Sequence, residues 1–131
     1  MDVIYIVNPG IQSGIVNEIL RQKGFKVIFG LRNENALNAL KEQEIKVVVL
    51  DIKDSTTVNV ISRLRESYPN QRVIALTPNQ EIHDQIFPLC LEAGAESILA
   101  RPYEPDGLVM LIEGSGYVTS QKEFQKRQQE P

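Results

Sequence analysis

Five short apolar segments alternate with five segments of helical periodicity along the first 113 residues. This alternation predicts an α/β fold in which a doubly wound, five-stranded parallel sheet carries helices on both faces. The third segment supports the prediction, because its continuous apolar core of Val47 to Leu50 is what a strand covered on both faces needs. The predicted strands are residues 3–7, 25–29, 45–51, 73–77 and 97–100.

Each predicted helix has apolar residues at spacings of three and four. Gly24, Pro69 and Gly94 follow three of these segments, and we expect helices to end there. We expect Asn33 to cap the second helix and Pro88 to kink or break the fourth. The apolar positions are Ile11, Ile15, Ile19 and Leu20; Ala36, Leu37 and Leu40; Val58, Ile61 and Leu64; Ile82, Ile86, Leu89 and Ala93; and Leu108, Leu111 and Ile112.

Length and composition limit the chain to one globular domain. At 131 residues and 14.8 kDa it is too short for two ordinary domains. A content of 42% hydrophobic and 24% charged residues excludes global disorder, and a pI near 5.2 argues against a nucleic-acid-binding surface. No apolar run approaches the roughly 20 residues of a membrane span. The start lacks the pattern of a secretory signal, so we expect a cytoplasmic protein with no membrane partner.

A single cysteine and a single histidine exclude several kinds of catalytic site. Cys90 has no partner for an intrachain disulfide, and with His83 alone it cannot complete a zinc site. A Ser-His-Asp triad would need His83, and the chain has no G-x-S-x-G motif. A nucleophilic pair of Cys90 and His83 is a weaker alternative to a buried structural cysteine. We therefore do not expect an enzyme.

The candidate site residues follow the predicted strands. In a doubly wound sheet, ligands and chemistry gather at the carboxyl ends of the strands. The residues at those ends are Asn8, Pro9, Asp51, Thr77 and Arg101. The segment 8–14 also follows a strand and opens a helix, as phosphate-binding loops do. Because it lacks both G-x-G-x-x-G and a Gly-Lys-Ser/Thr motif, nucleotide binding is the weaker interpretation.

Four short motifs occur in a characteristic order: VVLD at 48–51, VIALT at 73–77, LEAGAES at 91–97 and RPY at 101–103. Through these motifs the chain resembles the receiver domain of two-component response regulators, the CheY-like fold, over about residues 3 to 113. The resemblance implies the strand order 2-1-3-4-5 with five flanking helices. It gives a receiver-like domain at 1–113, followed by a flexible joint and a linker helix or tail at 114–131.

The resemblance also implies roles for the residues at the strand ends. Asp51 would accept a phosphoryl group from a histidine kinase, as the carboxylate nucleophile of the family. Thr77 would be the switch hydroxyl, and Arg101 stands where the family has a lysine. The family holds Mg²⁺ with this aspartate and with an acidic pair after the first strand. Such domains often use the fourth helix, fifth strand and fifth helix to dimerise or to hold an output domain.

The chain departs from the family where the metal would bind. Asn8 and Pro9 occupy the positions of the acidic pair, and a proline side chain offers no ligand. We therefore expect no cofactor, and weak Mg²⁺ binding at best. Asp54 is near in sequence but lies off the family's ligand positions. Because an arginine fork suits a carboxylate, we predict that Arg101 pairs with Asp51, directly or through water.

Other positions carry departures or alternative interpretations. Lys53 adds a positive charge near the pocket, which substitutes for metal charge or is simply solvated. Ile98 occupies the place of the family's aromatic switch residue, so the coupling of hydroxyl and aromatic ring lacks one half. Thr77 could instead cap the helix that follows it. Arg101 before Pro102 could serve packing or the cis peptide that the family has at this bond.

Three hypotheses for the function follow. The first is a receiver-like signalling domain, impaired in phosphorylation, that acts by protein-protein contact through the fourth helix, fifth strand and fifth helix. Its partner would be another protein, an output domain C-terminal to this chain, or a second copy. The second is a phosphoaccepting receiver modified at Asp51 by a histidine kinase. The third is a small-molecule-binding module of flavodoxin-like shape that uses the segment 8–14.

Overall fold

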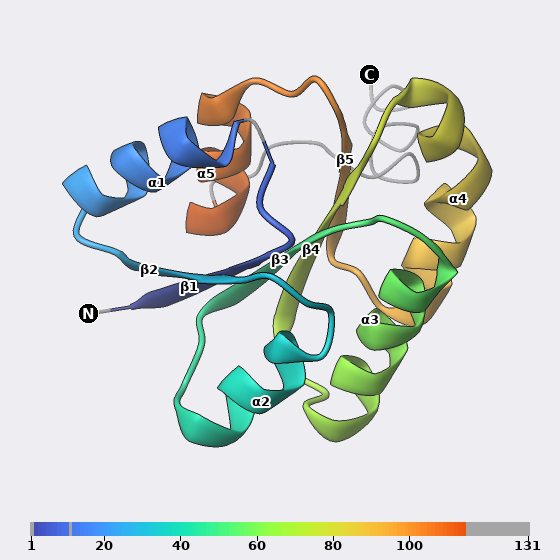
Figure 1. The fold of residues 1–131 in the computed structure, drawn as a ribbon, viewed down its shortest axis with the longest axis horizontal. Helices are drawn as coiled ribbons and strands as arrows, with labels where there is room; N and C mark the ends of the chain where they lie inside the picture. Colours follow the sequence, from blue (N-terminus) through green and yellow to red (C-terminus); the bar gives the residue numbers. More distant parts are fainter. Residues whose placement is uncertain (1, 11, 115–131) are drawn as a thin grey trace, which may run out of the picture.

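The computed structural model describes residues 2–10 and 12–114, in which five strands alternate with five helices (Figure 1). Ile11 of the first predicted helix and the predicted joint and tail after Gly114 lie outside the described residues. The strands are β1 (Val3–Val7), β2 (Lys26–Gly30), β3 (Val47–Asp51), β4 (Arg72–Thr77) and β5 (Ser97–Ala100). The helices are α1 (Ser13–Gln22), α2 (Asn35–Glu42), α3 (Ser55–Ser67), α4 (Gln80–Ala93) and α5 (Pro105–Glu113).

The strands form one parallel sheet in the order β2-β1-β3-β4-β5. This confirms the predicted α/β fold and its strand order. The central strand β3 pairs with β1 on one side and with β4 on the other, with Asp51 opposite Leu76. The carboxyl ends of these strands therefore meet at one edge of the sheet, where Asn8, Asp51 and Arg101 follow or end their strands.

The helices cover the two faces of the sheet and enclose two cores. Helices α1 and α5 lie on one face, and α2, α3 and α4 lie on the other (Figure 1). Val47 and Val49 of β3 belong to the core under α1 and α5, whereas Val48 and Leu50 belong to the other core. All four are fully buried, as expected of a strand covered on both faces. Among the described residues, no helix is long and apolar enough to cross a membrane.

The alternation of side chains along the strands separates two of the predicted site residues. Asp51 is two residues after Val49, so it leaves β3 on the face covered by α1 and α5. Thr77 is two residues after Ala75, so it leaves β4 on the face covered by α3 and α4. The carboxylate and the hydroxyl thus start from opposite faces of the sheet.

Helix α4 continues through Pro88, so the prediction that this proline breaks the helix is wrong. A proline inside a helix removes one backbone donor, which costs about 3 kcal/mol. Phe87 and Cys90 flank it and are buried in the core beneath α4. Burial of one large apolar side chain contributes about 1.5–3 kcal/mol, which is enough to offset much of the lost hydrogen bond.

Candidate functional site

An ion pair between Asp51 and Arg101 lies at the carboxyl edge of the sheet. Asp51 ends β3, and Arg101 directly follows β5. The guanidinium Nη2 donates to the carboxylate Oδ2, and the two side chains are only 15% and 17% exposed. The structure therefore confirms the predicted pairing, and the contact is direct.

Burial and charge act in opposite directions on Asp51. Burial raises the pKa of its carboxyl, because a low-dielectric surrounding disfavours the ionised form. The hydrogen bond and charge of Arg101, and the charge of Lys53, offset part of that rise. The neighbouring cations thus favour the ionised form of this carboxylate, against the effect of burial.

Arg101 is held by the segment after β1 and by Tyr103. A Cβ atom placed on Gly10 would lie 2.8 Å from Cζ of Arg101, so the absence of a side chain at this position lets the backbone meet the guanidinium. The guanidinium also lies 5.5 Å from the centre of the Tyr103 ring. Gln12 donates to the carbonyl of Tyr103 at 2.6 Å and accepts from its amide at 3.4 Å. The sequence analysis missed the roles of Gly10, Gln12 and Tyr103 because they depend on contacts between distant segments.

Asn8 points its amide into the interior of the site. It is 4% exposed, and its backbone adopts a φ of 58°, which asparagine tolerates better than most residues. Its Nδ2 donates to Oδ1 of Asn33 at 2.7 Å and to the carbonyl of Asp51 at 3.3 Å. The next residue, Pro9, is exposed. A neutral amide thus fills the place at which the first acidic residue was expected.

Asn33 belongs to this network and does not cap α2, so the predicted capping role is wrong. The residue before α2 is Glu34, whose side chain makes no capping hydrogen bond. Asn33 Oδ1 instead accepts from Asn8 and, at 3.2 Å, from the buried Thr57 hydroxyl. That hydroxyl accepts in turn from the backbone amide of Lys53 at 3.3 Å. Asparagine and threonine at these positions give a neutral set of hydrogen bonds beside the ion pair.

Asp54 and Lys53 lie on the loop between β3 and α3. Asp54 caps α3, because its Oδ1 accepts from the amides of Thr56 at 2.9 Å and Thr57 at 3.3 Å. This capping is sufficient reason for an aspartate at this position. The Lys53 side chain is exposed, and its charge lowers the pKa of Asp51. The structure thus places Lys53 close enough to act on the carboxylate through its charge.

Thr77 is fully buried and contacts His83 of α4. Its Oγ1 lies 3.0 Å from Nδ1 of His83 and 3.5 Å from the carbonyl of Leu99. The capping role considered for Thr77 is wrong, because Asn79 caps α4 by accepting from the amide of Ile82 at 2.8 Å. His83 had been considered as a partner of Cys90, but its ring hydrogen-bonds to Thr77.

Cys90 is a buried structural residue. Burial raises the pKa of its thiol to about 11, so the thiolate form is scarce at neutral pH. Its neighbours belong to the apolar core under α3 and α4. This supports the interpretation of Cys90 as a small buried hydrophobic residue.

The model of the family described as response regulator receiver domain matches residues 8–113. The chain belongs to this receiver-domain family. Its fold is similar to that of a response regulator from Thermotoga maritima, with a TM-score of 0.76 and 23% identity over 87% of this chain and 96% of that one. The receiver domain of the response regulator TorR gives a TM-score of 0.78 and 20% identity over 88% and 96% of the two chains. The BeF3-activated receiver domain of DrrB gives 0.73 and 28% identity over 87% and 96%.

A curated relative is the probable transcriptional regulatory protein TcrX of Mycobacterium tuberculosis. The two are 26% identical over 112 residues, which is 84% of this chain and 47% of the relative. The receiver domain described here thus spans about half the length of that relative. Family membership assigns this chain to two-component signalling, as the motifs around Asp51, Thr77 and Arg101 predicted.

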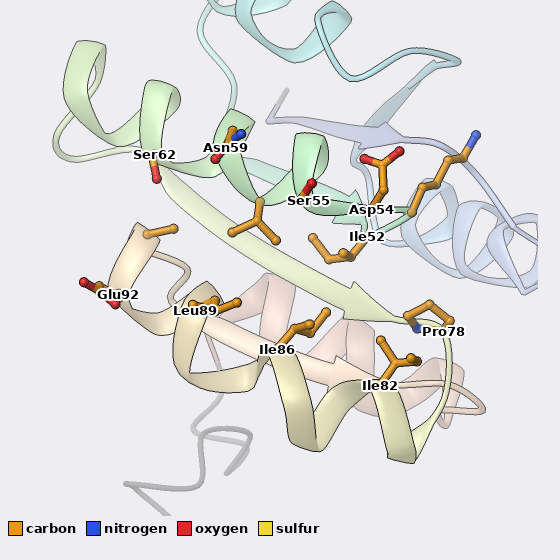
Figure 2. Close-up of a pocket in the computed structure, with 13 residues that line it drawn as sticks. Ile52, Asp54, Ser55, Asn59, Ser62, Pro78, Ile82, Ile86, Leu89 and Glu92 are labelled. Carbon is orange, nitrogen blue, oxygen red and sulfur yellow. The ribbon is translucent and has the colours of Figure 1, made fainter.

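A groove lies between α3 and α4 of this receiver domain (Figure 2). Its volume is about 640 Å³. Ile82, Ile86 and Leu89 of α4 line one wall and face Ile52, while polar residues such as Ser62 and Glu92 lie toward one end (Figure 2). The first turn of α4 thus contributes both to this groove and, through His83, to the surroundings of Thr77.

Two further positions concern the bond after Arg101 and the side chain of Ile98. The bond between Arg101 and Pro102 is cis. Ile98 is 1% exposed and lies in the same core as Val73 and Ala75, on the face of the sheet that Thr77 shares. An apolar side chain fills the position of the aromatic switch residue and offers Thr77 no hydrogen bond.

Proposed function

We propose that this receiver domain is impaired in phosphorylation and signals by protein-protein contact through α4, β5 and α5. The observation that carries the proposal is the buried contact between Arg101 and Asp51. A carboxylate nucleophile must present a free oxygen in line with the phosphorus atom it attacks. Here the carboxylate is paired with a guanidinium that lies against Gly10 and 5.5 Å from the centre of the Tyr103 ring. Because the positive charge withdraws electron density from both carboxylate oxygens, the pair lowers the nucleophilicity of Asp51 and opposes its attack.

The donor atoms beside Asp51 do not suit Mg²⁺. Pro9 has no ligand atom, and the Nδ2 group of Asn8 points as a donor at Asn33 and at the carbonyl of Asp51. Mg²⁺ needs oxygen ligands in a near-octahedral set and loses water reluctantly. Within residues 2–10 and 12–114, no group of three or more His, Cys, Asp or Glu side chains could hold a metal ion. We therefore infer that Mg²⁺ binds weakly at best, and that the positive charge of Arg101 takes the place of the metal charge beside Asp51.

Exposed apolar residues support a role of α4 and α5 in contacts with a partner. Leu89 on α4 is 53% exposed, and Met110 on α5 is 39% exposed. The two residues lie on opposite faces of the sheet, and Leu89 also lines the groove between α3 and α4. Exposed large hydrophobic residues are frequent in protein interfaces. The proposed partner is a cytoplasmic protein, an output domain or a second copy of this domain. Nucleic acid and membranes are not among the proposed partners, because the chain carries a net charge of −3.

Treatment with Mg²⁺ and a small phosphodonor or beryllofluoride tests the proposal. We expect no gain of a phosphoryl group by mass spectrometry and no shift of the amide signals of Asp51, Thr77 and Arg101. Asp51→Asn is the matched negative control. Metal-dependent modification of the wild-type chain that Asp51→Asn abolishes would overturn the proposal and favour the phosphoaccepting alternative.

A gain-of-function variant makes a negative result informative. Asn8→Asp and Pro9→Asp together supply the missing carboxylates, and Arg101→Lys replaces the fork by a mobile point charge. We expect the triple variant to take up beryllofluoride with Mg²⁺ while the wild type does not. Failure of both proteins under conditions in which an active receiver domain responds would show that the residues named here are not the cause.

A further inference from the structure

A continuous series of contacts runs from Asp51 to α4. The carboxylate of Asp51 contacts the guanidinium of Arg101. The backbone amide of Arg101 donates to the carbonyl of Thr77 at 2.9 Å. The hydroxyl of Thr77 lies 3.0 Å from Nδ1 of His83. Each link joins a different element, so the state of the carboxylate is connected to the first turns of α4 without an aromatic residue on β5.

Burial favours the neutral form of the His83 ring that contacts Thr77. Burial lowers the pKa of His83, and the charge of Asp84 opposes this change. A neutral imidazole accepts at one nitrogen and donates at the other. The carbonyl of Leu99 is 3.5 Å from Thr77, at the limit of a hydrogen bond, whereas His83 is at 3.0 Å. An unprotonated Nδ1 accepts from the Thr77 hydroxyl, whereas a protonated Nδ1 donates to it and leaves the hydroxyl proton for Leu99, so both tautomers keep the contact between Thr77 and His83.

We propose that His83 is a positioning residue that holds the switch hydroxyl of Thr77 on the α4 side of the sheet and transmits changes at Asp51 and Arg101 to α4. It supplies the polar partner that Ile98, an apolar residue, cannot supply. The inference deepens the proposed function, because α4 is part of the proposed contact surface. It adds the residue through which that surface depends on the site.

The surroundings of His83 support this role. Its ring lies 5.1 Å from the ring of Phe87, which is buried in the core under α4. The imidazole is thus fixed between a core residue and Thr77, so loss of the hydrogen bond changes the contacts of α4 itself. Pro78 and Ile82, next to Thr77 and His83 in sequence, line the groove between α3 and α4 (Figure 2). A change at this point therefore reaches a surface that a partner can contact.

The first test reads the hydrogen bond directly on the full chain. Nitrogen-15 NMR distinguishes an imidazole Nδ1 that takes part in a hydrogen bond from one that does not. We expect Nδ1 of His83 to be hydrogen-bonded in the wild type and to lose the bond in Thr77→Val, which keeps the shape of the side chain. An unchanged Nδ1 signal in Thr77→Val would overturn the proposal.

The second test measures whether a change at Asp51 alters the amide signals of α4. Asp51→Asn removes the charge at the site, and we expect amide signals at residues 80–84 to shift in the wild-type background. His83→Phe keeps a ring beside Phe87 but has no ring nitrogen to bond with Thr77, and in this background the shifts should stop at Thr77. His83→Asn places an oxygen near the position of Nδ1 and should restore the shifts in part. If all three backgrounds fold and Asp51→Asn shifts the amide signals of residues 80–84 equally in each, the proposal is overturned.

These tests use no phosphodonor and no metal, so they are independent of the proposed impairment. Uptake of beryllofluoride would overturn the impairment and leave the contact between Thr77 and His83 in place. A negative result in the NMR tests would show that His83 does not link Thr77 to α4, and it would not affect the pairing of Asp51 with Arg101.

Discussion

The contacts of Asp51 and of Thr77 differ in charge, although both residues end neighbouring strands. Asp51 and Arg101 form an ion pair with side chains about one-sixth exposed. Thr77 and His83 form a neutral hydrogen bond, and the ring is kept neutral by burial. Removal of one partner of a buried ion pair leaves an uncompensated charge, whereas removal of one partner of a neutral bond leaves a smaller desolvation penalty. The first contact should therefore control stability, and the second should control how the site communicates with α4.

The largest effect is expected for Arg101→Gln. Loss of the guanidinium leaves Asp51 without its main cation, so we expect a loss of about 3 kcal/mol in the free energy of unfolding at pH 7. The pKa of Asp51 in the folded state should rise further, because the two effects of Arg101 that lower it are gone. The folded variant then binds its proton more tightly than the unfolded chain, so its stability falls as the pH rises through the window between the two pKa values.

Urea unfolding at pH 4 and pH 7 measures this effect. The deficit of Arg101→Gln relative to the wild type should be smaller at pH 4, where Asp51 is more often protonated. A control with Asp51→Asn and Arg101→Gln together should recover part of the loss at pH 7. A deficit that is the same at both pH values would mean that Arg101 acts by packing and not by its charge.

An intermediate effect is expected for Gly10→Ala. The new Cβ would meet the guanidinium of Arg101 at less than 3 Å, so either the arginine or the segment 8–14 must move. We expect a loss of about 1–2 kcal/mol, as for other overpacked sites. Gly14→Ala is the matched control, because its Cβ would meet no atom within 4 Å; in helix α1 it should stabilise by up to about 1 kcal/mol. Equal effects of the two variants would show that Gly10 does not define the position of Arg101.

The smallest effect is expected for His83→Phe. At pH 7.5 we expect a loss of about 1 kcal/mol, the usual contribution of one neutral hydrogen bond. Because burial lowers the pKa of His83 below its ordinary value of 6.5, the unfolded chain takes up a proton first as the pH falls. The stability of the wild type should therefore fall below about pH 6.5, and the deficit of His83→Phe should shrink at pH 5.5. A deficit that grows at pH 5.5 would contradict a neutral buried ring.

Sequence patterns predicted the elements well and the polar contacts unevenly. The predicted bounds of β1, 3–7, agree with the structure, and the strand order follows the family resemblance. The pairing of Arg101 with Asp51 could be predicted because the chemistry of the two residue types and their places at strand ends both favour it. Capping by Asn33, the alternative capping role of Thr77 and a helix break at Pro88 were wrong because each was interpreted from sequence neighbours alone. In the fold, Asn33 contacts Asn8, Thr77 contacts His83, and buried neighbours support the turn of α4 at Pro88.

The sequence by itself determined the α/β architecture, the family and the identity of the charged residues at the sheet edge. Those properties follow from local periodicity and from residue types at the ends of strands, which are visible along the chain. Only the tertiary structure decided which polar groups meet: Gly10 under Arg101, Asn8 with Asn33 and Thr77 with His83. Such contacts depend on the faces from which side chains leave neighbouring elements and on a spacing of a few ångströms, and neither is encoded in any one segment.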